Sequence, residues 1–442
     1  MQDLERKQSL AKEKAVLARV ITHDEIIDVD EDPLEECERL AMTAGTVIKS
    51  GIVQRRQAMH AATAFGKGKV EELATLVEHY EAEVVIFDND LSPAQTRNLE
   101  KAVHAKVIDR TELILDIFAS NAQTLESRLA VELAQLEYSL PRLKRMWTHL
   151  DRVKMGVGMR GPGEKQLEVD RRLVEKRISD LRKELKVIEK RKERLVASRS
   201  DVMTVSLVGY TNAGKSTLMN ALTDAKVLAE DKLFATLDTR TRRWQLPNWG
   251  PVLLSDTVGF IKNLPHRLIA SFKATLEEAH QADLLLHIAD GSNPAVYQQI
   301  RSVYEVLEEI GIEEKDTLLV INKVDQIKDA HQLDLILNRY PNAVSISAIT
   351  RKGFQSLAMA VSDALSRSFL DLMVETGVEN GRLMAFIAAR GEILSTRFSE
   401  TKVVIHCRLP EKYAGQIDRH QATVTPRDEF VSERESIVPP SE

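Results

Sequence analysis

The sequence contains few cysteines, few aromatic residues and no long apolar run. Its two cysteines, Cys37 and Cys407, lie far apart among 442 residues and have no metal-ligand neighbours. This spacing argues against a disulfide framework or a zinc site, and it favours a reducing, cytoplasmic location. Each cysteine is expected to be a small buried apolar residue.

No segment approaches the roughly 20 consecutive apolar residues of a membrane-spanning helix. The first 14 residues are polar and contain no apolar core of a signal peptide. We therefore expect no stable membrane insertion, and we expect a monomer. The apolar fraction of 43% is sufficient for packed cores, and the length suggests about three domains.

Charge is distributed unevenly along the chain. The net charge is −6, but residues 142–199 contain 19 Lys and Arg against nine Asp and Glu, a local balance of +10. The remainder of the chain therefore carries −16. A basic segment of this kind indicates a polyanionic partner.

A glycine-rich motif directly follows the apolar run of residues 202–208. A strand, a glycine loop and a helix in this order form a phosphate-binding loop, whose backbone N–H groups and helix dipole stabilise a polyphosphate. Lys215 is expected to reach the β- and γ-phosphates, and the Ser216 hydroxyl to ligate Mg²⁺. The predicted phosphate-binding residues are Gly209, Tyr210, Thr211, Asn212, Ala213, Gly214, Lys215, Ser216 and Thr217.

Two later strand ends carry further nucleotide motifs. After residues 252–255, Asp256 is expected to bind Mg²⁺ through water, and the Gly259 N–H to sense the γ-phosphate. In Asn-Lys-x-Asp, a buried Asp325 carboxylate would accept from both N1–H and the 2-amino group of guanine, a donor pair that adenine lacks. A backbone amide at residues 347–348 suits guanine O6, so GTP is the predicted nucleotide. These further predicted site residues are Asp256, Thr257, Val258, Gly259, Asn322, Lys323, Asp325, Ser347 and Ala348.

A threonine between these motifs should complete the Mg²⁺ shell and close over the γ-phosphate as a switch loop. Thr236 is favoured because apolar residues flank the Ala235–Thr236 pair, and Thr239 and Thr241 are the alternatives. Phe234 and Ala235 are assigned to the nucleotide site with it. The residues to which we assign catalytic roles are Lys215, Thr236 and Gly259.

Phe260 occupies the position at which Ras-like GTPases carry a water-orienting glutamine. Phenylalanine has no hydrogen-bonding group and cannot orient water. The sequence therefore predicts slow intrinsic turnover, raised by a partner that orders the switches or excludes water.

Two apolar seams with alternating spacings of four and three predict a long antiparallel helical hairpin. Pro141 is expected to kink or break the first helix near Leu140, and Lys192 interrupts the second seam. The first seam comprises Leu129, Leu133, Leu136, Leu140, Leu143, Trp147 and Leu150, and the second Val174, Ile178, Leu181, Leu185, Ile188 and Leu195.

The segment 152–166 between these helices holds four glycines and a proline, so no regular structure is expected there. A flexible, solvated loop is one interpretation. We favour a basic tip that inserts into folded RNA, because basic charge continues through residues 190–192. The tip has no aromatic residue, so structured RNA fits better than stacked single strands. The predicted RNA-binding residues are Arg152, Lys154, Arg160, Lys165, Arg171 and Arg172.

The predicted fold class is α/β, with a P-loop GTPase domain preceded by a small βαβ domain and the helical hairpin, and followed by a small α/β C-terminal domain. A strand at 84–87, a helix from Ser92 to Val103 and a strand at 107–108 indicate the parallel N-terminal layer. In the C-terminal domain, Leu383 to Leu394 form a helical stripe. His287 is expected to be a packed core histidine. The predicted domains are residues 1–122, 123–200, 201–369 and 370–425, with a disordered tail at 426–442.

Several runs resemble the HflX family of translational GTPases. They are the loop from Gly156 to Arg172, Phe234-Ala-Thr-Leu-Asp238, Asp256-Thr-Val-Gly-Phe-Ile261 and Leu264-Pro-His266. The resemblance implies an HflX-type N-terminal domain, Mg²⁺-dependent GTP binding, and binding to the large ribosomal subunit and its rRNA, with ribosome-stimulated hydrolysis. It also implies the splitting or rescue of stalled ribosomes under stress. A ribosome-assembly GTPase and a nucleotide-gated RNA-binding scaffold remain alternatives.

Overall fold

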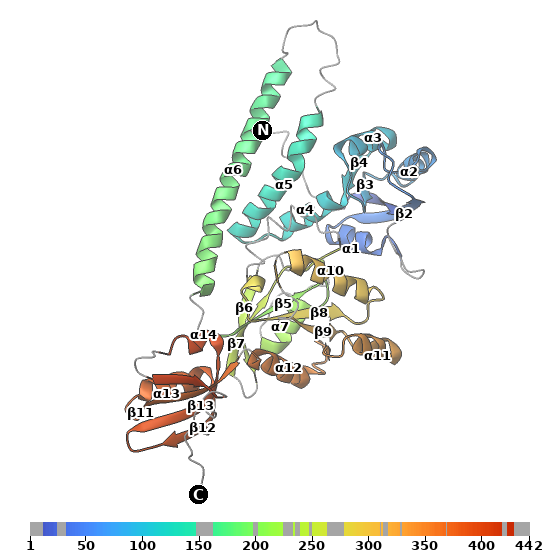
Figure 1. The fold of residues 1–442 in the computed structure, drawn as a ribbon. Coiled ribbons are helices and arrows are strands. Elements are labelled where there is room, and N and C mark those ends of the chain that lie inside the picture. Colours follow the sequence, from blue (N-terminus) through green and yellow to red (C-terminus); the bar gives the residue numbers. More distant parts are fainter. Residues whose placement is uncertain are drawn as a thin grey trace. The chain divides into compact units, whose positions relative to one another are not determined.

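The computed structural model (Figure 1) describes residues 12–23, 32–146, 162–197, 202–223, 233–234, 239–246, 250–262, 278–309, 311–312, 317–327, 329–367, 369–417 and 422–427. The chain divides into two compact units. One comprises Met1–Ser200, Thr204–Trp244 and Val252–Gly353, and the other Asp201–Met203, Gln245–Pro251 and Phe354–Glu442. Within the described ranges, no helix has both the length and the apolar character needed to cross a membrane.

The first unit begins with a four-stranded parallel sheet in the order β2-β1-β3-β4. Its strands are β1 (Lys14–Thr22), β2 (Val47–Arg56), β3 (Val84–Phe87) and β4 (Lys106–Asp109). Four helices cover it, α1 (Glu35–Thr43), α2 (Lys67–Tyr80), α3 (Pro93–Val103) and α4 (Arg110–Asn121). One apolar core contains residues of α1 and α4, and a second contains residues of α2 and α3. The helices therefore cover both faces, as a parallel sheet requires, and the expected small βαβ layer is confirmed.

Two long helices follow, α5 (Leu125–Met146) and α6 (Pro162–Ala197), which run side by side as a hairpin (Figure 1). Leu129, Leu133, Ile178 and Leu181 form their shared apolar core, packed by five further residues of the predicted seams. Lys192 interrupts the second seam. Its ammonium group donates to Glu126 of α5 at 2.8 Å, so its charge is paired with a carboxylate of the facing helix.

The structure differs from two expectations for the hairpin. Helix α5 does not break near Leu140, because it continues through Pro141 to Met146, and the alternative of a kink there stays a prediction. The segment predicted to be irregular is helical from Pro162 onward. Proline is tolerated at the first position of a helix, because a backbone N–H there would have no hydrogen-bond partner within the helix. Trp147 and Leu150, which were assigned to the first seam, lie outside the described residues.

The nucleotide motifs lie on a six-stranded sheet in the order β10-β9-β8-β5-β7-β6. The strands from β10 to β7 pair in parallel. The strands are β5 (Thr204–Gly209), β6 (Arg240–Leu246), β7 (Gly250–Asp256), β8 (Leu284–Asp290), β9 (Thr317–Asn322) and β10 (Val344–Ser345). The helices of this part are α7 (Lys215–Thr223), α10 (Val296–Glu309) and α11 (Ala330–Arg339).

His287 is a core residue, as predicted. It lies on β8 with 1% of its surface exposed, and its ring packs against that of Tyr304 at 4.9 Å. Burial lowers the pKa of His287 to about 3, with a further contribution from Lys215. The imidazole is therefore neutral at physiological pH and does not exchange protons with a ligand.

The second unit contains α12 (Phe354–Ser366) and a four-stranded sheet in the order β12-β13-β11-β14. The strands are antiparallel, β11 (Phe369–Gly377), β12 (Glu392–Phe398), β13 (Lys402–Pro410) and β14 (Ala422–Pro426), with helices α13 (Gly381–Arg390) and α14 (Glu411–Ala414). Both cysteines are free thiols with no exposed surface, as expected.

The predicted helical stripe ends earlier than expected. Leu383, Phe386 and Ile387 belong to α13 and pack in the core, but Leu394 is 39% exposed on β12. The helix stops because Gly391 takes an extended conformation directly after Arg390, and β-branched residues then favour a strand. Strand β14 includes Pro426, and the rest of the predicted tail, from residue 428, lies outside the described residues.

Candidate nucleotide-binding site

The loop between β5 and α7 depends on two glycines. Gly209 has φ +148°, and a β-carbon there would lie 2.2 Å from the Ile288 carbonyl oxygen. Gly214 has φ +92°, and a β-carbon would lie 2.4 Å from the Asn322 amide nitrogen. Any side chain at either position would be strained and would collide with the neighbouring strand ends. The loop can therefore lie close against the ends of β8 and β9.

Lys215 is buried at the start of α7. Its ammonium group donates to the carbonyl oxygens of Gly209 at 3.0 Å and Tyr210 at 2.9 Å, so it folds back over the loop. Burial lowers the pKa of Lys215 to about 8, although the nearby Asp256 carboxylate opposes this shift. A polyphosphate placed against this loop would supply the counter-charge that the buried ammonium group needs.

The two predicted metal-binding side chains lie together. The Ser216 hydroxyl donates to an Asp256 carboxylate oxygen at 2.6 Å, although the two residues are 40 positions apart. Asp256 has no exposed surface. A hydroxyl and a carboxylate are oxygen ligands of the kind that Mg²⁺ prefers, so the residues present fit this ion. Within the described part of the chain, no cluster of three or more His, Cys, Asp or Glu side chains forms a metal site.

Asn322 connects the base-recognition motif to the phosphate loop. Its amide group donates to the Ala213 carbonyl at 2.9 Å, and its side-chain oxygen accepts the Ala348 N–H at 3.0 Å. Lys323 adopts a left-handed backbone with φ +61° and pairs with Asp290 at 2.8 Å. The phosphate loop, the turn after β9 and the segment at Ala348 are remote in sequence, and these contacts hold them around one cavity.

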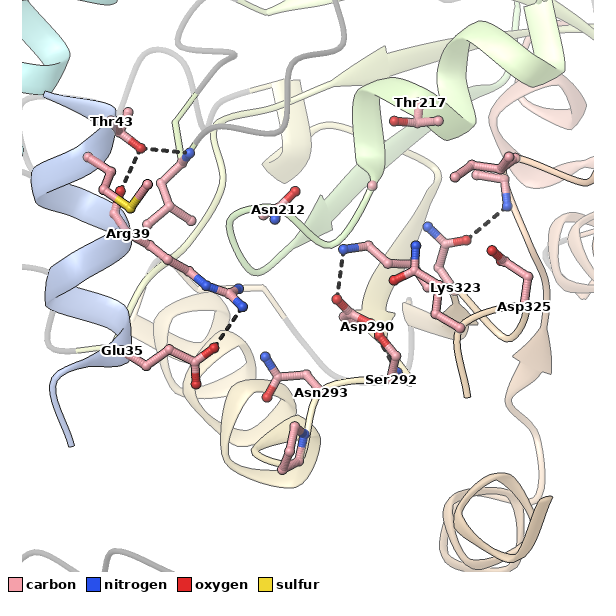
Figure 2. Close-up of a pocket in the computed structure, with 18 residues that line it drawn as sticks. Glu35, Arg39, Thr43, Asn212, Thr217, Asp290, Ser292, Asn293, Lys323 and Asp325 are labelled. Carbon is pink, nitrogen blue, oxygen red and sulfur yellow. Dashed lines mark hydrogen bonds and ion pairs between the residues drawn. The ribbon is translucent and has the colours of Figure 1, made fainter. Parts of the chain in front are cut away.

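The predicted buried state of Asp325 is wrong, because this carboxylate is exposed at the cavity wall. It lies in the turn that follows β9, where the chain leaves the core of the sheet. Its carboxylate still faces the cavity beside Lys323 (Figure 2). A guanine base bound there would itself cover the carboxylate, so selection between purines does not require burial beforehand.

The segment after β7 lies over the phosphate loop. The Phe260 N–H donates to the Gly209 carbonyl at 3.0 Å, and the Thr211 N–H donates to the Phe260 carbonyl at 2.7 Å. A β-carbon on Gly259 would lie 2.8 Å from a Thr211 side-chain carbon and 3.1 Å from the Lys215 ammonium nitrogen. The Phe260 side chain is buried in an apolar core, so it reaches no position from which a water could be oriented.

The cavity has a volume of about 880 Å³. Among the predicted site residues, those that line it are Asn212, Gly214, Thr217, Asn322, Lys323, Asp325 and Ala348. Lys215, Ser216 and Asp256 lie directly behind this surface, as the contacts above show. Thr257 is buried and donates to the Leu207 carbonyl at 2.7 Å, which fixes β7 against β5. Ser347 is also buried, and its hydroxyl accepts the Thr350 N–H.

Several predicted residues are elsewhere or are not described. Phe234 does not line the cavity, because its ring packs edge-on against Phe118 at 4.7 Å. Ala235 and Thr236 lie outside the described residues, so the choice of switch threonine stays a prediction. Of the alternatives, Thr239 donates to Glu278 at 3.0 Å, and Thr241 lies on β6. Arg152, Lys154 and Arg160, and the side chain of Lys165, also fall outside, whereas Arg171 and Arg172 are exposed on α6.

Sequence analysis missed one wall of the cavity, which comes from α1 of the N-terminal sheet. Glu35, Arg39, Met42 and Thr43 line the same cavity as the nucleotide motifs (Figure 2). The Leu233 N–H contacts the Thr43 hydroxyl at 3.4 Å. These residues precede the phosphate loop by about 170 positions, and no local pattern marks them.

A buried polar network ties the N-terminal helices to the phosphate loop. The Tyr210 hydroxyl donates to Glu36 and accepts the Lys262 N–H at 2.8 Å. Arg110 pairs with Glu36 at 3.1 Å and with Asp88, and it donates to the Lys262 carbonyl at 3.0 Å. Burial, followed by the Glu36 charge, raises the pKa of Tyr210 well above its usual value. The phenol therefore remains a hydrogen-bond donor throughout the physiological range.

The fold and this cavity together define a P-loop guanine-nucleotide-binding enzyme. Matches to protein-family models agree with the order of the parts. Residues 31–119 match a model described as GTP-binding GTPase N-terminal, residues 121–199 one described as GTP-binding GTPase middle region, and residues 204–323 one described as 50S ribosome-binding GTPase.

The chain belongs to the HflX family of GTPases. It is 44% identical to the GTPase HflX of Magnetococcus marinus, over 92% of this chain and 95% of that protein, and 48% identical to that of Escherichia coli, over 84% and 88%. A more distant similarity is to the crystal structure of a GTP-binding protein from Sulfolobus solfataricus in complex with GDP. It is 23% identical, covers 80% of this chain and 99% of that chain, and has a TM-score of 0.43. The chain is accordingly a GTP-hydrolysing enzyme.

The residues around this cavity are suited to binding and electrostatic stabilisation. The loop amides and Lys215 would neutralise phosphate charge, which is the main requirement of phosphoryl transfer. Ser216 and Asp256 would hold a Mg²⁺ ion, which supplies further charge neutralisation when bound. Phe260, which directly follows the Asp-x-x-Gly motif, is apolar and buried, so it offers no group that could activate water.

Proposed function

We propose that this protein is a GTP-dependent switch that binds the large ribosomal subunit through its basic hairpin and dissociates or rescues stalled ribosomes. Hydrolysis is slow in the free protein and is stimulated on the ribosome. The single observation that supports this most is a basic helical hairpin in the same compact unit as a domain matching the 50S ribosome-binding GTPase model.

Part of the positive charge of α6 is already used within the hairpin. Arg177 pairs with Glu132 at 2.7 Å and Arg182 with Glu137 at 2.6 Å, and Lys192 is held by Glu126. These contacts support the hairpin and leave less charge for a partner. Attraction to RNA phosphates is therefore assigned to the tip and to the exposed cations of α6, which include Lys176, Lys186, Lys190 and Arg191.

Sedimentation profiles of ribosomes distinguish the proposal from its alternatives. Full-length protein would be added to intact ribosomes with GTP, GDP or a non-hydrolysable GTP analogue. Splitting predicts loss of intact ribosomes with GTP and with the analogue, but not with GDP. Association only with immature subunits would favour the assembly GTPase, and binding that ignores the nucleotide would favour the scaffold. Either of these outcomes overturns the proposal.

A second experiment tests the role of the hairpin tip. Neutralising Arg152, Lys154, Arg160 and Lys165 together should weaken ribosome binding and flatten its salt dependence, because fewer counterions are released. A matched control neutralises four exposed cations of the N-terminal sheet domain, Arg55, Lys67, Lys101 and Lys106. Equal losses for the two quadruple variants, or unchanged binding of the tip variant at several salt concentrations, would rule out the tip as the contact.

A further inference from the structure

We propose that Arg39, on helix α1 of the N-terminal domain, is a binding residue for the phosphate chain of the guanine nucleotide. The side chain extends from α1 into the cavity toward the P-loop, as Figure 2 shows. The nucleotide site would then include one cation from outside the GTPase domain. This inference rests on the nucleotide site and not on the proposed ribosomal function.

The direction of Arg39 is fixed by two anchors on its own helix. Glu36, Arg39 and Thr43 are separated by three and four positions, so they share one face of α1. Glu36 is bound by Tyr210 of the P-loop and by Arg110, and Thr43 accepts from the Leu233 N–H. Since its neighbours on this face contact the GTPase domain, Arg39 must face the same way.

The charges that line the cavity leave Arg39 as its most available cation. Among the described lining residues, the only cations are Arg39 and Lys323, against the carboxylates of Glu35, Asp290 and Asp325. Lys323 is held by Asp290 at 2.8 Å, and both of their side chains are largely buried. Of these two cations, the half-exposed guanidinium of Arg39 can therefore reorient more readily toward a polyphosphate that enters the cavity.

The present partner of Arg39 is one that a phosphate can replace. Arg39 donates to Glu35 at 2.7 Å within the same helix, and the two side chains are 49% and 51% exposed. Exposed pairs of this kind are weak because water screens them. A guanidinium binds a phosphate more strongly, through two parallel hydrogen bonds to a doubly charged group. The Glu35 carboxylate thus competes with the nucleotide phosphates for the Arg39 guanidinium.

Nucleotide affinity of the full-length protein tests this assignment. Arg39→Ala should weaken GDP and GTP binding by about three- to tenfold, and GMP, with its shorter phosphate chain, by less. Arg39→Lys should recover part of the loss, because the charge is kept and the two-pronged geometry is not. Arg55→Ala, which removes an exposed arginine of β2 away from the cavity, should leave all three affinities unchanged.

Glu35 provides a second and independent readout. Glu35→Gln removes the competing carboxylate and should tighten GDP binding by about two- to threefold, but only while Arg39 is present. In the Arg39→Ala background the same change should have no effect. Thermal unfolding without nucleotide checks that each variant is folded. The assignment is overturned if folded Arg39→Ala protein binds GDP as tightly as the Arg55→Ala control, or if it loses GMP binding as strongly as GTP binding. An effect of Glu35→Gln that persists without Arg39 would also overturn it.

Discussion

Lys215 illustrates how a single buried charge links folding, pH and nucleotide binding. Burial lowers the pKa of its ammonium group from 10.5 to about 8. Because the folded-state pKa is lower than the unfolded-state one, the folded protein releases this proton first as the pH rises. The cost of burying the charge is therefore fully present below about pH 8. It is removed as the pH rises from about 8 to 10.5, and stability increases through this window.

A bound polyphosphate should raise the pKa of Lys215 again, so nucleotide binding takes up a proton above about pH 8. We predict that the dissociation constant for GDP increases about fourfold between pH 7 and pH 8.5. A fluorescence titration at constant ionic strength and constant Mg²⁺ measures this. Lys215→Arg should bind more weakly but without this pH dependence, because a guanidinium does not titrate there. A flat profile for the unmodified protein, or an equal slope for the arginine variant, would contradict the prediction.

At the residue scale, the sequence predicts site residues where their chemistry and spacing are local, and the structure brings these residues together. The P-loop, Asp256 and Asn322 could be assigned because each follows an apolar strand and carries a side chain suited to phosphate, Mg²⁺ or guanine. Arg39 and Thr43 could not, because their place at the cavity is set by packing between distant segments. The exposure of Asp325 was also missed, since the motif specifies its chemistry but not its solvent contact.

At the scale of elements, the helical hairpin depends on its apolar seam. Leu181 of α6 has no exposed surface and packs with Leu129 and Leu133 of α5, whereas Leu173 on the same helix is 59% exposed. Leu181→Ala removes the same atoms as Leu173→Ala from a very different environment. The pair of variants therefore separates burial from helix propensity, which is equal for the two changes.

We predict that Leu181→Ala destabilises the hairpin by about 2–4 kcal/mol, and Leu173→Ala by less than about 0.5 kcal/mol. Helix content followed by circular dichroism during urea unfolding gives both values. Similar losses for the two leucines would mean that the seam does not hold the hairpin together.

The element boundaries show where sequence patterns lose their information. The seams predicted the pairing of α5 and α6 because a repeat of three and four leaves one apolar stripe. Pro141 did not end α5, because contacts on both sides of it hold the helix: Leu140 packs in the seam, and Arg142 pairs with Asp109 at 2.7 Å. Leu394 continued the apolar spacing of α13 but lies beyond Gly391, in a strand. Periodicity alone does not reveal such a change of structure.

On the scale of the first compact unit, the N-terminal domain contacts three segments of the predicted nucleotide site. Glu36 binds Tyr210 in the P-loop, and Arg110 binds the backbone of Lys262 after the Asp-x-x-Gly motif. Asn121 donates to the Phe234 carbonyl at 2.9 Å, beside the predicted switch threonine. A change in any of these segments would therefore alter a contact with α1 or α4.

We predict that Tyr210→Phe lowers the free energy of unfolding by about 1–2 kcal/mol, because two hydrogen bonds are lost and the ring is kept. It should also accelerate GDP release, since the P-loop is less firmly held. Stopped-flow release of a fluorescent GDP measures the rate. Tyr138→Phe is the control, because that hydroxyl, on α5, donates to Asp109 at the end of β4 at 2.7 Å and neither residue lines the cavity. It should reduce stability without changing release, and equal release rates for the two variants would refute the link.

The length of α6 has a mechanical consequence. Its 36 residues extend about 54 Å at a rise of 1.5 Å per residue. A tilt of about 5° at the Ala197 end would displace the Pro162 end by about 5 Å, the length of one helical turn. Under the proposed function the helix would act as a lever arm, which converts a small change of angle at its base into a displacement large enough to separate two macromolecular surfaces.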